Sequence, residues 1–231
     1  MSRESDGRRE RSRQSRMRMV VAAYKLFCQR GYNVPLADIA SEAGASVQNL
    51  YFTFHNKQNL VGEVLQLAVL GDDRPIPPHE REWFQELRDA NTPETAIRVW
   101  VSNTLPIYAR VAPLAGMFQS EPDLAPMWLH SERLRLDGFQ QVMREVAEKG
   151  RLKPGVTLNE AADVMFVLLS PQTYQQFISD RAWSPTRWGA WITAVLVAAI
   201  FEPWAKPGAS ARAHRPSISA QAGSSEQGAG Y

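Results

Sequence analysis

The stretch PLADIASEAGASVQNLYFTFHNKQNL at residues 35–60 decides the fold of this 231-residue chain. Pro35 favours the start of a helix and Gly44 its end, so a helix of about two turns lies between them. Ser46 is a favourable N-cap for a second helix that runs to about Phe54. Two short helices joined by a turn that contains glycine are typical of a helix-turn-helix motif.

The second of these helices has two usable faces. Leu50 and Phe54 lie one helical turn apart and can pack against the neighbouring helices. The other face is suited to a major groove, because Gln and Asn pair bidentately with adenine and apolar groups contact the thymine methyl. We expect the base-reading residues to be Val47, Gln48, Asn49, Phe52 and Thr53. An ordinary surface helix of a bundle is the alternative interpretation.

Positive charge is concentrated at the N-terminal end. Residues 1–60 contain ten Lys or Arg and five Asp or Glu, a net charge of +5, whereas the remaining 16 basic and 19 acidic residues give −3. Seven arginines lie between Arg3 and Arg18, in a segment with too few apolar residues to fold alone. We therefore predict an extended basic arm that attracts phosphates, with Arg16 and Arg18 as contacts. A solvated tail is the alternative.

The same region resembles the DNA-binding domain of TetR-type transcriptional regulators. The match runs in register over some forty residues of AYKLF…GYNVPLADIASEAGASVQNLYFTFHNKQNL. It comprises Ala23, Leu26, Phe27, Gly31, Tyr32, Asp38, Ile39, Ala40, Ala43, Gly44, Ser46, Leu50, Tyr51, Phe54, Lys57 and Leu60.

The resemblance implies a three-helix DNA-binding domain, followed by a helical domain for ligand binding and dimerisation. It also implies that Tyr51 and Lys57 contact phosphates. The sequence departs from the usual pattern in three places: Val34-Pro35 replaces a pair of hydroxyl residues, Gln48 replaces a frequent glycine, and Phe52 replaces a frequent histidine. The operator sequence therefore cannot be taken from relatives.

The rest of the chain also has helical patterning. A first helix with apolar residues at Val20, Val21, Tyr24, Leu26 and Phe27 is expected over 17–30, and a fourth over 57–70. Beyond a loop at 71–80, helices are expected over 81–90, 93–112, 128–149, 158–181 and 185–204, with breaks at Pro113, Pro122 and Pro126. Strand alternation is not apparent, so the predicted fold is all-α.

Four segments follow from this pattern. They are a basic arm at 1–18, a helix-turn-helix domain at 19–60, a ligand-binding and dimerisation domain at 61–204, and a disordered tail at 205–231 that is rich in Ala, Gly, Ser, Pro and Gln.

The last two predicted helices are apolar around most of their circumference. A helix without a polar face must be covered on more than one side. We expect the same two helices of a second subunit to cover them in a twofold four-helix interface. The expected interface residues are Trp188, Trp191, Ala194, Val195 and Ala198.

Aromatic and methionine side chains crowd the middle of the second domain. Such side chains suit a pocket for a largely apolar small molecule, and they equally suit plain core. The candidate pocket residues are Trp100, Tyr108, Phe118, Trp128, Phe139, Met143, Met165 and Phe166.

An enzyme is the competing class, but its usual signs are missing from the sequence. His55, His79, His130 and His214 are scattered without metal-ligand spacing, and Cys28 has no histidine or acid near it. The sequence contains no phosphate-binding glycine loop or nucleophile elbow. We therefore expect neither catalytic residues, nor a metal, nor a cofactor.

The composition favours a cytoplasmic protein. The longest apolar run, residues 188–201, is shorter than the roughly 20 residues that cross a bilayer, and the arginine-rich start lacks the apolar region of a signal peptide. A single cysteine indicates no disulfide framework. No membrane partner is expected.

These observations predict a transcriptional regulator that represses from a palindromic operator in double-stranded DNA. We expect it to bind as a homodimer and to be released by a small apolar effector. The helix over 57–70 would connect the two regions. The alternative is an all-helical small-molecule-binding protein or enzyme without a DNA target.

Overall fold

The computed structural model describes residues 3–72 and 76–203. Within these ranges the chain is helical, and the only β pairing is an isolated bridge between Leu152 and Phe201. The elements in order are α1 Arg3–Arg30, α2 Leu36–Ala43, α3 Val47–Phe54, α4 Lys57–Leu70, η1 Pro78–Glu80, α5 Trp83–Asp89, α6 Pro93–Ser120, η2 Pro122–Leu124, α7 Ala125–Ala147, α8 Leu158–Leu168, α9 Pro171–Gln175, η3 Gln176–Asp180 and α10 Pro185–Ile200. The predicted all-α fold is confirmed.

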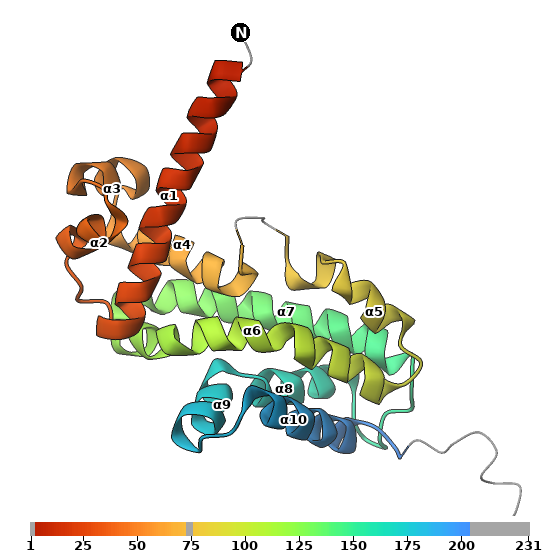
Figure 1. The fold of residues 1–231 in the computed structure, drawn as a ribbon. Coiled ribbons are helices and arrows are strands. Elements are labelled where there is room, and N and C mark those ends of the chain that lie inside the picture. The colour runs from red at the N-terminus through yellow and green to blue at the C-terminus, as the bar shows by residue number, and fades with distance from the viewer. Residues whose placement is uncertain (1–2, 73–75, 204–231) are drawn as a thin grey trace, which may run out of the picture.

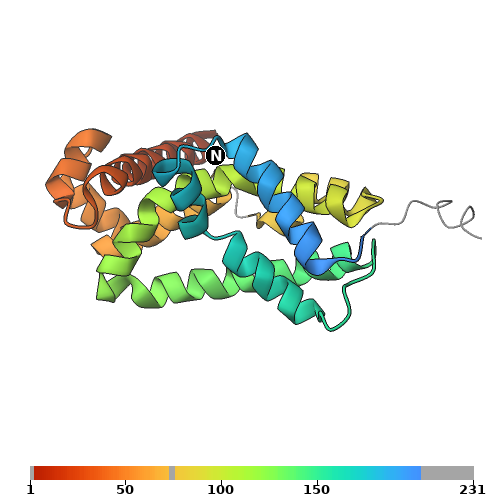
Figure 2. The ribbon, with the colours of Figure 1, turned by 90° about the horizontal axis from the view of Figure 1, so that it is seen from below.

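The helices form two connected groups. Figure 1 shows α1–α4 at one end of the molecule and the long helices α6 and α7 side by side through the rest. Helix α5 covers α6 and α7 on one side, and α8–α10 cover them on the other. Seen from below in Figure 2, α8 and α10 lie across this long pair.

The helix-turn-helix has the caps that the sequence predicts. The Ser46 side chain accepts a hydrogen bond from the Asn49 N–H at 3.1 Å, which begins α3. The Asn56 side chain accepts from the Asn59 N–H at 2.8 Å and begins α4. Gly44 ends α2 in the left-handed conformation with φ 62°, which glycine adopts without strain. The bounds of α2, α3 and α4 therefore agree with the prediction.

The predicted extended arm is wrong from Arg3 onward, because α1 is continuous from Arg3 to Arg30. Arginine, glutamate and glutamine are good helix formers, and a folded core from Met19 onward supplies a nucleus on which the helix can propagate. Glu10 adds local support, since its carboxylate accepts hydrogen bonds from Arg13 at 2.9 Å and Gln14 at 2.8 Å.

Two predicted breaks are wrong. Pro126 lies in the first turn of α7, where proline is tolerated. Pro113 does not end a helix; both Pro106 and Pro113 lie inside α6. The buried side chains that follow, such as Leu114 and Phe118, keep the helix packed and offset the hydrogen bond that each proline removes.

In contrast, the predicted helix over 158–181 is interrupted. Leu169 has φ −93° and ψ 55°, outside the helical region, and Ser170 caps the new helix α9 by accepting from the Thr173 N–H. Pro171 explains the break, because proline lacks an N–H and disfavours helical conformation in the residue before it. The chain then forms a π-helical turn at η3 before α10.

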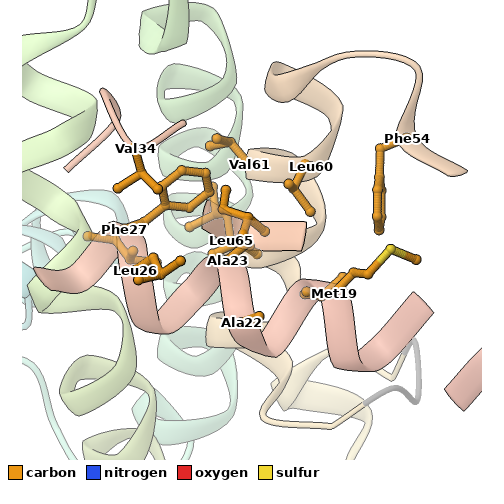
Figure 3. Packing of buried hydrophobic residues seen from close by; sticks show 14 of the residues in the cluster. Met19, Ala22, Ala23, Leu26, Phe27, Val34, Phe54, Leu60, Val61 and Leu65 are labelled. Atoms are coloured by element: carbon orange, nitrogen blue, oxygen red, sulfur yellow. The ribbon is translucent and has the colours of Figure 1, made fainter. Parts of the chain in front are cut away.

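Two hydrophobic clusters hold the molecule together. The first joins α1–α4 to the C-terminal half of α6 and to η2. Figure 3 shows Phe54 of α3 beside Met19 of α1, and Leu60 and Val61 of α4 above α1. The second cluster joins α5 and the part of α6 from Ala96 to Ala112 to α7, α8, α9 and α10. Helix α6 is therefore a member of both clusters.

Two expectations remain open. The predicted disordered tail, 205–231, lies outside the described residues. The boundary predicted at residue 60 stays a prediction, since the first cluster continues from α4 into α6.

No helix that the structure describes is both long and apolar enough to cross a membrane.

Candidate nucleic-acid interface

Helix α3 has the two faces that the sequence predicts. Leu50 and Phe54 are 2% and 3% exposed and anchor the helix in the first cluster. The opposite side carries polar and apolar groups at the surface: Val47, Gln48, Asn49 and Phe52 are exposed, and Thr53 is half-buried. The Thr53 hydroxyl donates to the Asn49 side-chain oxygen at 3.4 Å, so the amide N–H₂ of Asn49 stays available to a base.

Phe52 is the most unusual member of this face. Its side chain is 82% exposed, although burial of a phenyl group is favourable. Tyr51, beside it, is 52% exposed. A short, well-capped helix that leaves two rings in solvent has a face suited to a partner surface.

Lys57 lies further inside than its predicted phosphate role requires. Its ammonium donates to the Val34 carbonyl oxygen at 2.7 Å and stands 4.5 Å from the centre of the Tyr32 ring. Burial lowers the pKa of Lys57, and the nearby carboxylate of Glu121 opposes this effect. Because an ammonium has three N–H donors, a phosphate contact stays compatible with this geometry.

The two predicted arginine contacts have different surroundings. Arg16 forms an ion pair with Glu63 of α4 at 2.7 Å, and its guanidinium stands 5.0 Å from the centre of the Phe54 ring. It thus ties α1 to both α3 and α4. Arg18 is exposed but lies nearly opposite Arg16 on α1, on the side of Arg11 and of the groove between α1 and α2, so the two arginines do not share one contact surface.

A groove of about 480 Å³ between α1 and α2 was not anticipated from the sequence. Val21, one of the apolar residues in the helical pattern of 17–30, is 51% exposed in this groove. An ion pair between Lys25 and Glu42 at 2.6 Å links the two helices there. The groove is lined by Arg13, Gln14, Met17, Arg18, Val21, Ala22, Lys25, Glu42 and Ala43.

This fold and this face define a helix-turn-helix DNA-binding protein. Residues 20–64 match the family model described as "Bacterial regulatory proteins, tetR family". The chain therefore carries the DNA-binding domain of the TetR family of transcriptional regulators, and the resemblance seen in the sequence is confirmed.

Solved structures extend the likeness to the second domain. FadR from Bacillus subtilis, in complex with stearoyl-CoA, has a TM-score of 0.65 and 16% identity, covering 80% of this chain and 98% of FadR. NalD, the secondary repressor of the MexAB-OprM multidrug efflux pump in Pseudomonas aeruginosa, has a TM-score of 0.62 and 18% identity, with coverage of 84% and 99%.

A third similar structure is SmeT, the repressor of the Stenotrophomonas maltophilia multidrug efflux pump SmeDEF. It has a TM-score of 0.60 and 18% identity, covering 81% of this chain and 91% of SmeT. SmeT has also been solved in complex with triclosan. At these identities the likeness establishes the fold. None of the curated proteins compared with this sequence matches it.

The eight candidate pocket residues do not form one group. Phe118 and Trp128 stack with ring centres 5.1 Å apart and belong to the first cluster. The remaining six belong to the second cluster or pack against it, where Trp100 and Phe139 meet edge to face at 5.8 Å. Those six are Trp100, Tyr108, Phe139, Met143, Met165 and Phe166.

The second cluster contains polar groups that spacing could not locate. The indole N–H groups of Trp100 and Trp188 are buried without a hydrogen-bond partner among the described residues. Arg135 of α7 donates to the Phe166 carbonyl oxygen at 2.8 Å and stands 3.7 Å from that ring. Burial raises the pKa of Tyr108, so its hydroxyl stays protonated at neutral pH.

One of the five residues predicted for the subunit interface is wrong. Trp188 is fully buried within its own chain against Tyr108 and Tyr174, so it cannot face a second subunit. Its spacing in an apolar helix did not reveal which side faced inward. The others keep a surface position: Ala194 and Ala198 are exposed, and Trp191 and Val195 are half-buried.

Helix α8, which the sequence analysis also assigned to the expected interface, carries exposed apolar side chains that were not named there. Val167 is 63% exposed and Leu158 is 41% exposed. Among the residues that the structure describes, His, Cys, Asp and Glu side chains form no cluster of three that could hold a metal ion.

Proposed function

We propose that this TetR-family regulator binds a palindromic operator as a homodimer, represses transcription there, and is released by a small apolar or amphipathic effector. The observation that carries the DNA-binding part is the outward face of α3, with Phe52 82% exposed beside Gln48 and Asn49. Amide groups and an apolar ring together can read adenine and the thymine methyl in a major groove.

The surface of α10 supports the homodimer. From Trp188 to Phe201 the sequence contains no charged residue, and yet Ala190, Ala194 and Ala198 lie exposed on one side. Val167 of α8, a helix that contacts α10, is a further exposed apolar side chain. Large uncharged surfaces of this kind are typical of subunit contacts.

A twofold dimer explains why the operator should be palindromic. Two copies of α3 related by a twofold axis read the same sequence on opposite strands. Their separation should be about 34–36 Å, one turn of B-DNA, if they enter successive major grooves. Bound in this way, the dimer represses by blocking access of the transcription machinery. DNA lies in the bacterial cytoplasm, where we place the protein.

The second cluster is the proposed effector site. Its aromatic walls suit an apolar body, and the unpartnered indole N–H groups of Trp100 and Trp188 could each donate to an acceptor on the ligand. The similar proteins FadR and SmeT are known as complexes with stearoyl-CoA and triclosan, respectively. We therefore expect an effector with a large apolar part and at least one hydrogen-bond acceptor.

Coupling between the sites would pass through α4 and α6. The Arg110 side chain of α6 donates to the Ala68 carbonyl oxygen at 2.8 Å, and the Tyr24 hydroxyl of α1 donates to the Arg110 carbonyl oxygen at 3.0 Å. A ligand that shifts α6 would thus move α1, on which α2 packs, and α4, which contacts α3. To reduce operator occupancy tenfold, the ligand must favour the released conformation by about 1.4 kcal/mol.

The test begins with duplexes selected from random DNA by the full-length protein. We expect a palindromic sequence, protected over two half-sites, and a mass that corresponds to a dimer in sedimentation. Selection of no sequence by a protein that still binds aromatic compounds would favour the alternative, a helical binding protein without a DNA target.

Effector release needs a separate experiment. Compounds that raise the melting temperature should be titrated into the protein–operator complex, with Trp100→Phe as the variant that removes one indole donor. Hits that stabilise the protein without lowering operator affinity would contradict the release mechanism while leaving DNA binding intact.

A further inference from the structure

The first half of α1 is a projecting basic helix. Figure 1 shows it rising past α3 with no other helix alongside. Between Gly7 and Arg18 it contains six arginines and one acid, Glu10, a net charge of +5. Arg8, Arg9, Arg11 and Arg13 are all exposed. Isolated like charges three and four residues apart destabilise a helix, so this segment has a surface that gains stability from an anionic partner.

One stripe of this helix faces the side on which α3 lies. Arg16 marks that side, because it stands over the Phe54 ring and pairs with Glu63. Arg9 lies seven residues earlier and therefore on nearly the same side of the helix, and Arg13 lies between them. At 1.5 Å per residue, Arg9 is about 10 Å further out than Arg16, beyond the last residue of α3. Arg11 points to the opposite side.

We propose that the stripe formed by Arg9 and Arg13 binds the phosphates of duplex DNA just outside each half-site of the operator. This inference rests on the proposed function. The occupant is DNA because the stripe continues the surface of α3 and has the opposite charge to a phosphate backbone. The distance of about 10 Å corresponds to about three base pairs of B-DNA.

The direction of α1 places this contact on the outer flank. In Figure 1, α8 and α10 lie on the lower face and the free end of α1 points upward, away from them. If α8 and α10 meet the second subunit, each α1 points away from the centre of the operator. The exposed ion pair between Arg13 and Glu10 does not prevent this, since such pairs contribute little and can be exchanged for a phosphate contact.

The test uses the operator that the full-length protein selects, as two duplexes. One ends at the outer edge of the half-sites, and the other continues for ten further base pairs on each side. Each phosphate contact changes the logarithm of the binding constant by about 0.9 for a tenfold change in salt concentration. One contact therefore contributes about eightfold in affinity at 0.1 M salt, compared with 1 M salt, where its contribution is taken as negligible. We therefore expect wild-type protein to bind the long duplex more tightly, and Arg9→Gln to lose about eightfold on the long duplex only.

Arg11→Gln is the matched control. It removes the same charge from another exposed position, on the opposite side of α1, and glutamine keeps a good helix propensity in both variants. We expect this variant to bind the long duplex within about twofold of wild type, because salt largely screens the interaction between a phosphate and a charge on the far side of the helix. The double variant Arg9→Gln/Arg13→Gln should have a salt dependence shallower by about two units. Circular dichroism should show equal helix content.

Two results would overturn the inference and leave the proposed function standing: equal affinity of wild type for both duplexes, or equal losses for Arg9→Gln and Arg11→Gln. Binding of anionic lipid vesicles that depends on Arg9, together with unchanged DNA affinity, would also overturn it and point to a membrane surface. If the wild type selects no operator at all, the proposed function fails and the inference fails with it.

Discussion

Replacement of Phe52 by alanine should separate DNA binding from folding. The side chain is 82% exposed, so about 160 Å² of a ring that can bury about 200 Å² is free to meet a partner. At about 25 cal/mol per Å², full coverage would contribute about 4 kcal/mol. Contact with one thymine methyl and its neighbours covers about half of the ring, so we expect a loss of about 2 kcal/mol, or about 30-fold in operator affinity.

The same substitution should leave the fold intact. Phe52 contributes little to the buried clusters, and alanine has the higher helix propensity, so the free energy of unfolding should stay within about 0.5 kcal/mol of wild type. Phe54→Ala in the same helix is the control. That ring is 3% exposed, and its loss should reduce the free energy of unfolding by about 3–5 kcal/mol.

Fluorescence anisotropy on the selected operator and urea unfolding give the two measurements. Unchanged operator affinity for Phe52→Ala would refute the assignment of this ring to the DNA interface. A large loss of stability would show instead that the ring packs against the protein in solution.

Gln48→Ala should lower affinity for the operator by about 1–3 kcal/mol and affect random DNA little, whereas Lys57→Ala should weaken both and make the salt dependence shallower by about one unit; equal losses for Gln48→Ala on both duplexes would contradict base reading. Ala194→Glu places a charge in the uncharged surface of α10 and should convert the dimer to a monomer in sedimentation, with loss of specific binding; an intact dimer would exclude this face. Burial raises the pKa of Tyr24 to about 12 from 10.0, so the neutral hydroxyl contributes stability that is complete below pH 10 and is lost as pH rises toward 12. In Tyr24→Phe, the free energy of unfolding measured with urea should no longer fall between pH 10 and pH 12. Because the substitution also removes the hydrogen bond to the Arg110 carbonyl oxygen, each protein is compared with its own stability near pH 7.

Local capping signals made the DNA-binding helices predictable. Ser46, Asn56 and Gly44 act through hydrogen bonds and backbone conformations that involve residues within a few positions. The two faces of α3 followed equally from spacing, since Leu50 and Phe54 must share a side. The assigned contacts with DNA stay predictions, because they depend on a partner that sequence spacing does not describe.

Features that depend on distant contacts were not predictable. Pro113 breaks an isolated helix, but α6 continues because both clusters hold it. Pro171 does break its helix, where Ser170 supplies a competing cap. Likewise Trp188 and Ala194 lie in one apolar run, and only the packing of α10 on α6 shows that Trp188 is interior. Arg135 was not singled out because the carbonyl groups to which it donates, those of Phe166 and Leu169, lie more than thirty residues away.

The membership of α6 in both clusters has a consequence for how the molecule melts. Val111, Leu114 and Phe118 complete the core under α1 and α4, while Ile97 and Trp100 of the same helix complete the other. Loss of either core removes the support of this shared helix, so calorimetry should record a single cooperative transition. A compound bound near Trp100 then raises the temperature at which α3 unfolds, although it lies nowhere near that helix, by the ordinary linkage between ligand binding and folding.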